Sequence, residues 1–318
     1  MITAEQLAQN IEEFLAFKHA LGHSYERGEL MLRSFLHFVN QKSGQKSKVM
    51  LETMVSEWLS RIAGRKPVTV ALELGVLRQL CLYRRRTDPH SFVPGREWAP
   101  QPVKSTFLPY IFSPDEIHQI LDAAANHHGR NLGATTLYTL ILILYCTGLR
   151  LGEGVRLQLQ DVDLERQLFI VRQSKGKTRL VPFRTDLAQA LKAYLSERGR
   201  IALASDNSAF LVRLSGDPLP VNVASGVIRR LLRQQGLKPE KGRVGPRPYD
   251  FRHAYAVHRL TDWYRQGLDV HARLPWLSAY MGHDNVLGTE VYLTATAELM
   301  SLASQRFEER LHSARRIR

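Results

Sequence analysis

Apolar residues recur at helical spacing in four successive segments of the N-terminal third of the chain. The first segment follows Thr3-x-x-Gln6, a capping-box pattern in which two side chains satisfy the free backbone groups at the start of a helix. Three further segments with the same periodicity lie within residues 32–39, 51–59 and 70–82. The pattern predicts a small bundle of four short helices, and we assign residues 1–88 to this domain.

Prolines interrupt the chain after the fourth segment and predict a linker over residues 89–112. Each proline removes a backbone donor and fixes φ, so six of them between residues 89 and 114 exclude a helix or a central strand there. The sequence Ser113-Pro114-Asp115-Glu116 then offers an N-cap serine, a proline at the first helical position and a glutamate that reaches back. This motif predicts the start of a second domain, residues 113–318.

The second domain is predicted to contain one β-hairpin and to be helical elsewhere. Strand-forming residues occur at 168–173 and 178–183, on either side of a turn at 174–177. The apolar run from Thr135 to Leu149 contains polar interruptions and is shorter than the roughly 18 residues of a membrane span, so we interpret it as a buried helix. The fold class is therefore mainly α with a small β-sheet. Further helices are expected at 185–198, 223–235, 250–264 and 298–318.

Basic residues are in excess in both predicted domains. The formal net charge is +14, and residues 1–88 alone hold 13 basic and 9 acidic side chains. A protein that contacts a polyanion such as DNA from two sides would have this distribution. A solvated basic surface is the plainer interpretation of charge taken alone.

The cysteines, the histidines and the N-terminus indicate which classes of protein are disfavoured. Cys81 and Cys146 lie among apolar neighbours and form no Cys-x-x-Cys motif, which argues against disulfides and zinc knuckles. The N-terminus lacks a secretory pattern, and the histidines lack a metal-ligand spacing such as H-E-x-x-H. We therefore expect a cytoplasmic protein with no cofactor, no metal and no membrane partner.

Five side chains of the second domain together supply what a metal-independent attack on a phosphodiester requires. Tyr292 is the candidate nucleophile, although a phenol with a pKa of about 10 needs cationic neighbours and a base. Arg150 and Arg252 carry planar donor forks that match nonbridging phosphate oxygens. Lys175 at the hairpin tip could protonate a departing 5′ oxygen, and His283 follows a glycine that is expected to end a helix.

For each of these residues taken singly, an ordinary structural role is the more common explanation. Arg150-x-x-Glu153 is typical of an ion pair on a helix surface, and Lys175 of a solvated turn. Tyr292 could equally belong to a core or an interface. Asp250 is the expected N-cap of the helix that carries Arg252, where backbone N–H groups would also face an anion. Only the order and spacing of the whole set favour a catalytic site.

That order and spacing resemble the tyrosine recombinases, the phage-integrase type of site-specific recombinase. The resemblance covers most of residues 113–300 and rests on four motifs, at 147–153, 174–182, 249–256 and 281–292. It implies that Arg150 and Arg252 are the arginine pair, that Lys175 is the hairpin lysine, and that His283 and Tyr292 are the family's histidine and nucleophile. The N-terminal bundle matches the family's core-binding domain in size and position only. The implied architecture is a four-helix core-binding bundle plus an α+β catalytic domain, which form a clamp around DNA.

The resemblance also implies an activity and partners. The implied function is that of a site-specific DNA recombinase, which cuts and rejoins double-stranded DNA through a 3′-phosphotyrosyl intermediate without metal or ATP. Strand exchange between two duplexes implies a homotetramer on synapsed DNA sites and a nucleoid-associated location, and helper recombinases are a further partner left open. A stripe of apolar residues in the tail would pack on its own domain or on a neighbouring protomer. The stripe comprises Leu299, Leu302, Phe307 and Leu311.

Tyr249 departs from the family pattern, which usually has histidine three residues before the second arginine. A neutral phenol is a poor base at pH 7 but can donate a hydrogen bond to phosphate, so Tyr249 stays among the candidate site residues. Removal of the Tyr292 proton would then fall to His283, His253 or water.

Two alternative functions stay open. One is a type IB topoisomerase-like enzyme that nicks and reseals a single duplex, and the other is a non-catalytic DNA-binding accessory protein whose site has decayed. Neither the target DNA sequence nor the direction of recombination, whether integration, excision or resolution, follows from periodicity, because base readout depends on a few side chains in the grooves.

Overall fold

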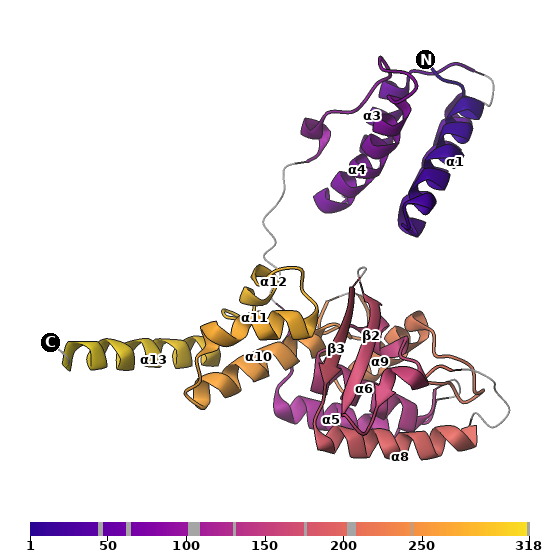
Figure 1. Cartoon of the computed structure of the whole chain (residues 1–318). Helices are drawn as coiled ribbons and strands as arrows, with labels where there is room; N and C mark the ends of the chain where they lie inside the picture. Colours follow the sequence, from indigo (N-terminus) through magenta and orange to yellow (C-terminus); the bar gives the residue numbers. More distant parts are fainter. Residues whose placement is uncertain are drawn as a thin grey trace. The chain divides into compact units, whose positions relative to one another are not determined.

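A computed structural model of the chain divides into two compact units, Met1–Thr106 and Phe107–Arg318 (Figure 1). Each unit has its own buried apolar cluster, and each is described by itself. The structure describes residues 1–43, 47–61, 65–100, 109–129, 132–174, 177–201, 208–242 and 244–316.

The first unit is built on four helices, as the periodicity predicts. The predicted capping box is present at the first of them, where Thr3 and Gln6 each accept a hydrogen bond from the other's backbone N–H. Phe35 and Trp58 meet in the core with their ring centroids 5.5 Å apart, and Phe92 and Trp98 pack against this core from the segment that follows the last helix. The elements are α1 (Ala4–Ala20), α2 (Glu26–Ser43), α3 (Leu51–Ser60), α4 (Pro67–Arg84) and the short 3-10 helix η1 (Arg96–Trp98).

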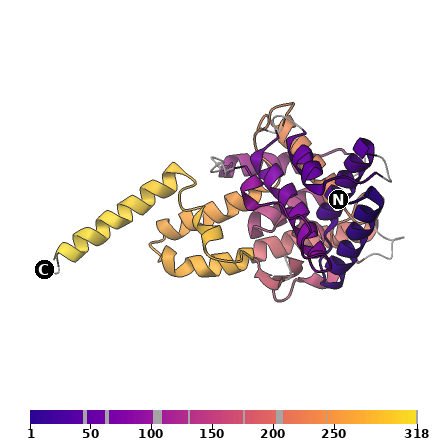
Figure 2. The ribbon, with the colours of Figure 1, turned by 90° about the horizontal axis from the view of Figure 1, so that it is seen from above.

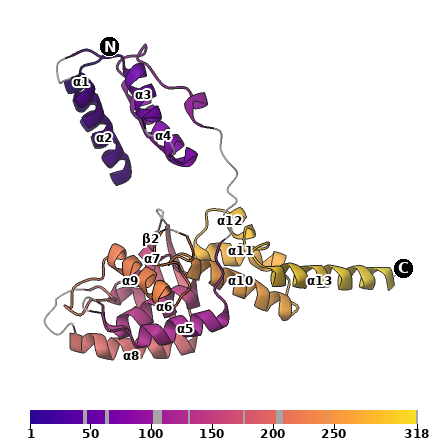
Figure 3. The same ribbon diagram turned by 180° about the vertical axis from the view of Figure 1, so that it is seen from behind.

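The first part of the second unit is a group of helices around α6 (Ala134–Thr147). Eight of the 14 residues of α6 are buried, so the predicted buried helix is confirmed. The Ser113 capping box with Glu116 is also present and begins α5. Figure 3 shows α5 and α6 from behind. The surrounding elements are α5 (Pro114–Ala125), α7 (Leu151–Val155), the 3-10 helix η2 (Leu159–Asp161), α8 (Thr185–Ile201) and α9 (Val221–Gln234).

A three-stranded antiparallel sheet supplies the small β component of this unit. Its order is β1 (Val162–Asp163), β2 (Leu168–Ser174) and β3 (Lys177–Pro182), with Phe169 opposite Val181. Both of these side chains are buried, because alternate positions of the hairpin face the helical core. The protein is thus mainly helical with one small sheet, as predicted.

The last part of the chain packs on α10 (Asp250–Arg265). A third apolar cluster joins α10, α11 (Val270–Met281) and the segment after α12 (Leu287–Glu290). The tail helix α13 (Ala297–Arg316) buries Leu299 in its first turn and then extends away from α10 and α11 (Figure 2). Its Phe307 is 67% exposed. Within the described parts of the chain, no helix is both long and apolar enough to cross a bilayer.

Candidate active site

Arg150 lies in a sharp turn that the sequence Gly148-Leu149-Arg150 makes between two helices. Gly148 ends α6 with a φ of +62°, a conformation that glycine adopts without strain, and Arg150 is the N-cap of α7. The Arg150 side chain donates to Glu153 Oε1 at 2.7 Å and to the carbonyl of Gly282 at 3.0 Å. Although burial acts to lower it, the pKa of Arg150 is raised by the hydrogen bond and charge of Glu153 and by Tyr249. This guanidinium is therefore held in place and stays charged.

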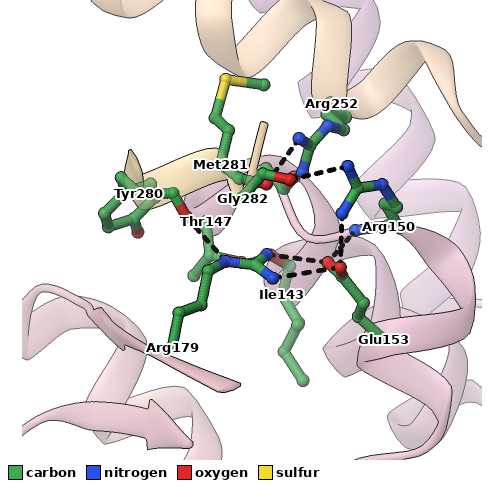
Figure 4. A network of polar contacts seen from close by, with 10 residues as sticks. Ile143, Thr147, Arg150, Glu153, Arg179, Arg252, Tyr280, Met281 and Gly282 are labelled. Carbon is green, nitrogen blue, oxygen red and sulfur yellow. Dashed lines mark hydrogen bonds and ion pairs between the residues drawn. The ribbon is translucent and has the colours of Figure 1, made fainter. Parts of the chain in front are cut away.

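Glu153 is a buried carboxylate shared by two arginines, not the surface partner that its spacing from Arg150 suggests. It is 4% exposed and accepts from the Arg150 backbone N–H at 2.9 Å as well as from the Arg150 side chain. Arg179 of β3 donates to both carboxylate oxygens, at 3.1 and 2.9 Å, and its Nε donates to the carbonyl of Tyr280 (Figure 4). The network ties the hairpin, α7 and the end of α11 together.

Arg252 is almost completely enclosed at the start of α10. It is 1% exposed, and it donates to the carbonyl of Gly148 at 2.7 Å and to the carbonyl of Met281 at 2.6 Å. Its Nε is buried and makes no hydrogen bond within the described residues. Burial, and then the nearby Arg150, lower the pKa of Arg252. An anion bound here would stabilise this arrangement, because it would accept a hydrogen bond from the buried Nε and would offset the positive charges of both guanidiniums.

The expected role of Asp250 as N-cap is wrong. Tyr249 is the N-cap of α10, in a helical conformation and without a side-chain cap, and Asp250 is the first residue of the helix. The Asp250 carboxylate instead accepts from the backbone N–H of Arg247 at 2.7 Å, in the turn before the helix. The backbone N–H of Arg252 donates to the Tyr249 carbonyl, so this group is satisfied within the start of the helix.

His283 is positioned by the glycine before it, as predicted. Gly282 ends α11 with a φ of +68°, and a Cβ built on it would lie 2.8 Å from Nη1 of Arg179. The His283 Nδ1 lies 2.7 Å from the hydroxyl of the buried Thr289, which fixes the ring. Both candidate arginines donate to the backbone just before this histidine. Arg252 donates to the carbonyl of residue 281, and Arg150 donates to the carbonyl of residue 282.

Tyr292 lies beneath the surface, with its hydroxyl among these groups. It is 2% exposed, its ring centroid is 6.3 Å from that of His283, and its hydroxyl lies 3.1 Å from Nδ1 of His253. Burial raises the pKa of Tyr292 to about 12, while the positive charge of Arg252 acts in the opposite direction. In this state the phenol is protonated and a weak nucleophile.

The structure therefore brings Arg150, Arg252, His283 and Tyr292 together around the turn at residues 281–283. Tyr249 lies at the rim, 39% exposed, with its ring centroid 4.9 Å from that of His253. Lys175 lies outside the described residues.

Comparison with known proteins agrees with this geometry. The model of the phage integrase family matches residues 111–298. A protein of Sinorhizobium fredii (strain NBRC 101917 / NGR234), named as integrase/recombinase y4rB, is 32% identical over 308 residues, which cover 95% of this chain and 97% of that protein. The tyrosine recombinase XerA of Thermococcus kodakarensis is 30% identical over 200 residues, 63% of each chain. The chain belongs to the phage integrase family.

Solved structures share the fold of this phage integrase family member. An integrase of the Tn1549 transposon in complex with circular intermediate DNA has a TM-score of 0.64 at 19% identity, and covers 96% of this chain and 99% of that chain. The XerH site-specific recombinase bound to difH substrate has a TM-score of 0.63 at 20% identity, with 90% and 81% covered. The predicted fold class and the predicted family of site-specific recombinases are confirmed.

One feature of this phage integrase site was missed from the sequence, the contact of Arg179 with Glu153. Strand alternation offers a signal for it, because Arg179 shares its side of β3 with the buried Val181. His253 was named as a candidate base, but its contact with Tyr292 spans 39 residues along the chain and has no periodic signature.

Proposed function

We propose that this recombinase cuts and rejoins double-stranded DNA through a 3′-phosphotyrosyl intermediate on Tyr292, without metal or ATP. The observation that supports the proposal is the position of the Tyr292 hydroxyl, which is buried against the face of α10 that carries Arg252. The turn at residues 281–283 binds Arg252 and Arg150 through two successive carbonyls, so one phosphate could contact both arginines.

Each group has a distinct role in the proposed reaction. Arg150 and Arg252 would bind the nonbridging oxygens and stabilise the charge that develops on the phosphorane, where one such donor is typically worth about 3 kcal/mol of barrier. Tyr292 attacks phosphorus, and Lys175 protonates the leaving 5′ oxygen. His283 and Tyr249 would donate hydrogen bonds to the phosphate. A 5′-hydroxyl of a partner duplex then attacks the phosphotyrosyl bond, so no external energy source is needed.

Burial of Tyr292 adds a requirement to this scheme. The Tyr292 side chain is only 2% exposed, so this side chain or a group that covers it has to shift before the hydroxyl contacts a DNA phosphate. The resting protein would therefore protect its nucleophile, and DNA binding would supply the free energy that exposes it.

DNA as the substrate is supported by the basic charge of the chain and by the solved neighbours, several of which are DNA complexes. A homotetramer on two synapsed sites, the grip of both units on one duplex, the participation of helper recombinases and a cytoplasmic, nucleoid-associated location belong to the same proposal. Binding should weaken steeply with salt, because lysine and arginine contacts release counterions from the DNA backbone.

The first experiment recovers genomic DNA bound by the protein and maps any covalent joint on it. Nicked suicide duplexes carrying that site should trap a protein–DNA adduct with the wild-type chain. The Tyr292→Phe variant, which lacks one oxygen atom, should bind the same duplex and form no adduct. Loss of binding equal to the loss of cleavage would contradict the role of Tyr292.

The alternative functions give different results in the same assays. A topoisomerase-like enzyme would relax supercoiled plasmid without synapsed sites and would give no recombinant from any pair of sites. A non-catalytic accessory protein would bind its verified site and form no adduct.

A further inference from the structure

His253 lies between two phenol rings at the start of α10. Its Nδ1 is 3.1 Å from the Tyr292 hydroxyl, and the two ring centroids are 5.4 Å apart. On the other side, the Tyr249 ring meets the His253 ring edge-on at 4.9 Å. The His253 side chain is only 12% exposed. The guanidinium of Arg252 is near enough for its charge to act on the pKa of this imidazole.

The second nitrogen of His253 faces a carboxylate. Nε2 is 3.7 Å from Oδ1 of Asp250, which is buried and is held by the backbone N–H of Arg247. A neutral imidazole has one N–H donor and one acceptor, and a carboxylate favours the proton on the nitrogen that faces it. Nδ1 therefore has its lone pair directed at Tyr292, and the phenol O–H donates the hydrogen bond.

The charge state of His253 agrees with this arrangement. Burial lowers the pKa of His253 to about 4, with the nearby Asp250 acting to raise it and the guanidiniums of Arg247 and Arg252 acting to lower it. The ring is therefore neutral at pH 7 and able to accept a proton. The positive charge of Arg252 disfavours a protonated His253. Negative charge that forms on phosphate oxygens next to Arg252 would offset this effect and so favour the imidazolium.

The other candidates for this role are less well placed. Tyr249 stands where the family usually has a histidine, and a phenol is a poor base at pH 7. His283 directs its Nδ1 to Thr289 at 2.7 Å, and its ring lies over that of Tyr292 at 6.3 Å between centroids. The Nδ1 of His253, in contrast, lies 3.1 Å from the oxygen that would react.

We propose that His253 is a catalytic residue, which takes the proton from Tyr292 as the phenol attacks phosphorus, with Asp250 as the positioning residue that orients the imidazole. This inference rests on the proposed function and names the base of the same site. When the bond between Tyr292 Oη and phosphorus forms, the phenol proton moves to His253 Nδ1. The bond from phosphorus to the 5′ oxygen breaks, and that oxygen takes a proton from the Lys175 ammonium.

The rejoining step reverses these transfers. The incoming 5′-hydroxyl loses its proton to the Lys175 amine as its oxygen bonds to phosphorus. The phosphotyrosyl bond breaks, and the imidazolium of His253 returns its proton to the Tyr292 oxygen. Both groups end in their starting protonation states.

The test compares His253→Asn with the wild-type chain in single-turnover cleavage of a nicked suicide duplex. An asparagine amide oxygen lies close to the position of Nδ1 and can accept the Tyr292 hydrogen bond, but it cannot take the proton. Loss of a general base typically slows a reaction by about 100-fold or more, and we expect that decrease with DNA affinity unchanged. A wild-type cleavage rate in His253→Asn would overturn the inference, because a role limited to positioning would be retained.

His258→Asn is the matched control, because His258 is on the same helix and is also partly buried, with its Nδ1 3.0 Å from the hydroxyl of Tyr145. The same substitution there should leave the cleavage rate within about 3-fold of wild type, since the base effect requires contact with the reacting oxygen. An equal loss of cleavage in both variants would show a general effect on α10 and would overturn the assignment.

Two further substrates separate the base from the acid. A duplex with sulfur in place of the bridging 5′ oxygen has a leaving group that needs no proton, so it should restore cleavage in Lys175→Ala and not in His253→Asn. A fluorinated tyrosine at position 292 has a more acidic phenol and should restore part of the rate in His253→Asn. Restoration of His253→Asn by the sulfur substrate, or no effect of fluorination, would overturn the proposal.

The outcomes distinguish this inference from the proposed function. A wild-type chain that binds its DNA and forms no Tyr292-dependent adduct would overturn both. A wild-type chain that cleaves, together with a His253→Asn variant that cleaves equally fast, would overturn the role of His253 alone.

Discussion

Removal of Arg179 should destabilise the second unit strongly, because it would leave a buried carboxylate with fewer partners. Arg179 makes two hydrogen bonds to Glu153 and one to the Tyr280 carbonyl, and its side chain is 13% exposed. Methionine at this position has a similar length and no donor. Breaking a buried ion pair from one side typically costs about 3 to 5 kcal/mol.

The cost can be converted into a change in melting temperature. For a unit of roughly 200 residues, 1 kcal/mol corresponds to about 2 to 4 °C, so Arg179→Met should lower the melting temperature by about 6 to 20 °C. Scanning calorimetry, with the urea midpoint as a second measure, tests this directly. Arg184→Met is a suitable control, because the ion pair of Arg184 with Asp186 joins side chains that are 81% and 67% exposed, and should contribute less than about 1 kcal/mol.

Cleavage should respond to the same change through Arg150. Glu153 binds both arginines, so the loss of Arg179 leaves Arg150 on a carboxylate whose position is less constrained.

In a double-mutant cycle, Arg179→Met combined with Glu153→Gln should cost less free energy of unfolding than the sum of the single variants. A melting temperature of Arg179→Met within about 2 °C of wild type would refute the reasoning, since it would mean that no buried charge had been left uncompensated.

Three further predictions concern the same site. Gly282→Ala should lower the free energy of unfolding by about 1 to 3 kcal/mol in urea titrations, because the position has a φ of +68° and a Cβ would lie 2.8 Å from Arg179; an unchanged urea midpoint would contradict this. Arg252→Lys should bind DNA but cleave about 100-fold more slowly in single-turnover assays, because a lysine cannot replace the fork that donates to Gly148 and Met281; equal rates would contradict the assignment. The pKa of His253 is lowered to about 4 in the folded chain, against about 6.5 in the unfolded chain, so the unfolded chain takes up the proton first as the pH falls. The stabilising contribution of this residue should therefore be present above pH 6.5 and be lost as the pH falls toward 4. Urea titrations should show that His253→Asn reduces this loss, and an identical pH dependence in the variant would contradict the prediction.

Local patterns in the sequence were sufficient for most of the secondary structure. The capping boxes at Thr3 and Ser113, the apolar periodicity and the glycine that ends α11 are contained within a few residues, and each is present as expected. These signals act between neighbours along the chain, so they do not depend on what the segment packs against. Asp250 shows the limit of such reasoning, because an aspartate near a helix start was assigned to the helix cap, whereas its carboxylate binds the turn before it.

Tertiary structure decided how the candidate residues meet. Arg150 and Glu153 have the spacing of a surface pair, yet Glu153 is buried and also binds Arg179, which arrives from a strand 26 residues away. The hydrogen bond between His253 and Tyr292 likewise depends on α11 and α12 returning the chain to α10. The sequence by itself thus determined which residues could do the chemistry and on which elements they lie. Which of them share a carboxylate, a carbonyl or a proton was decided by long-range packing, since contacts between distant segments leave no periodic trace in the order of the amino acids.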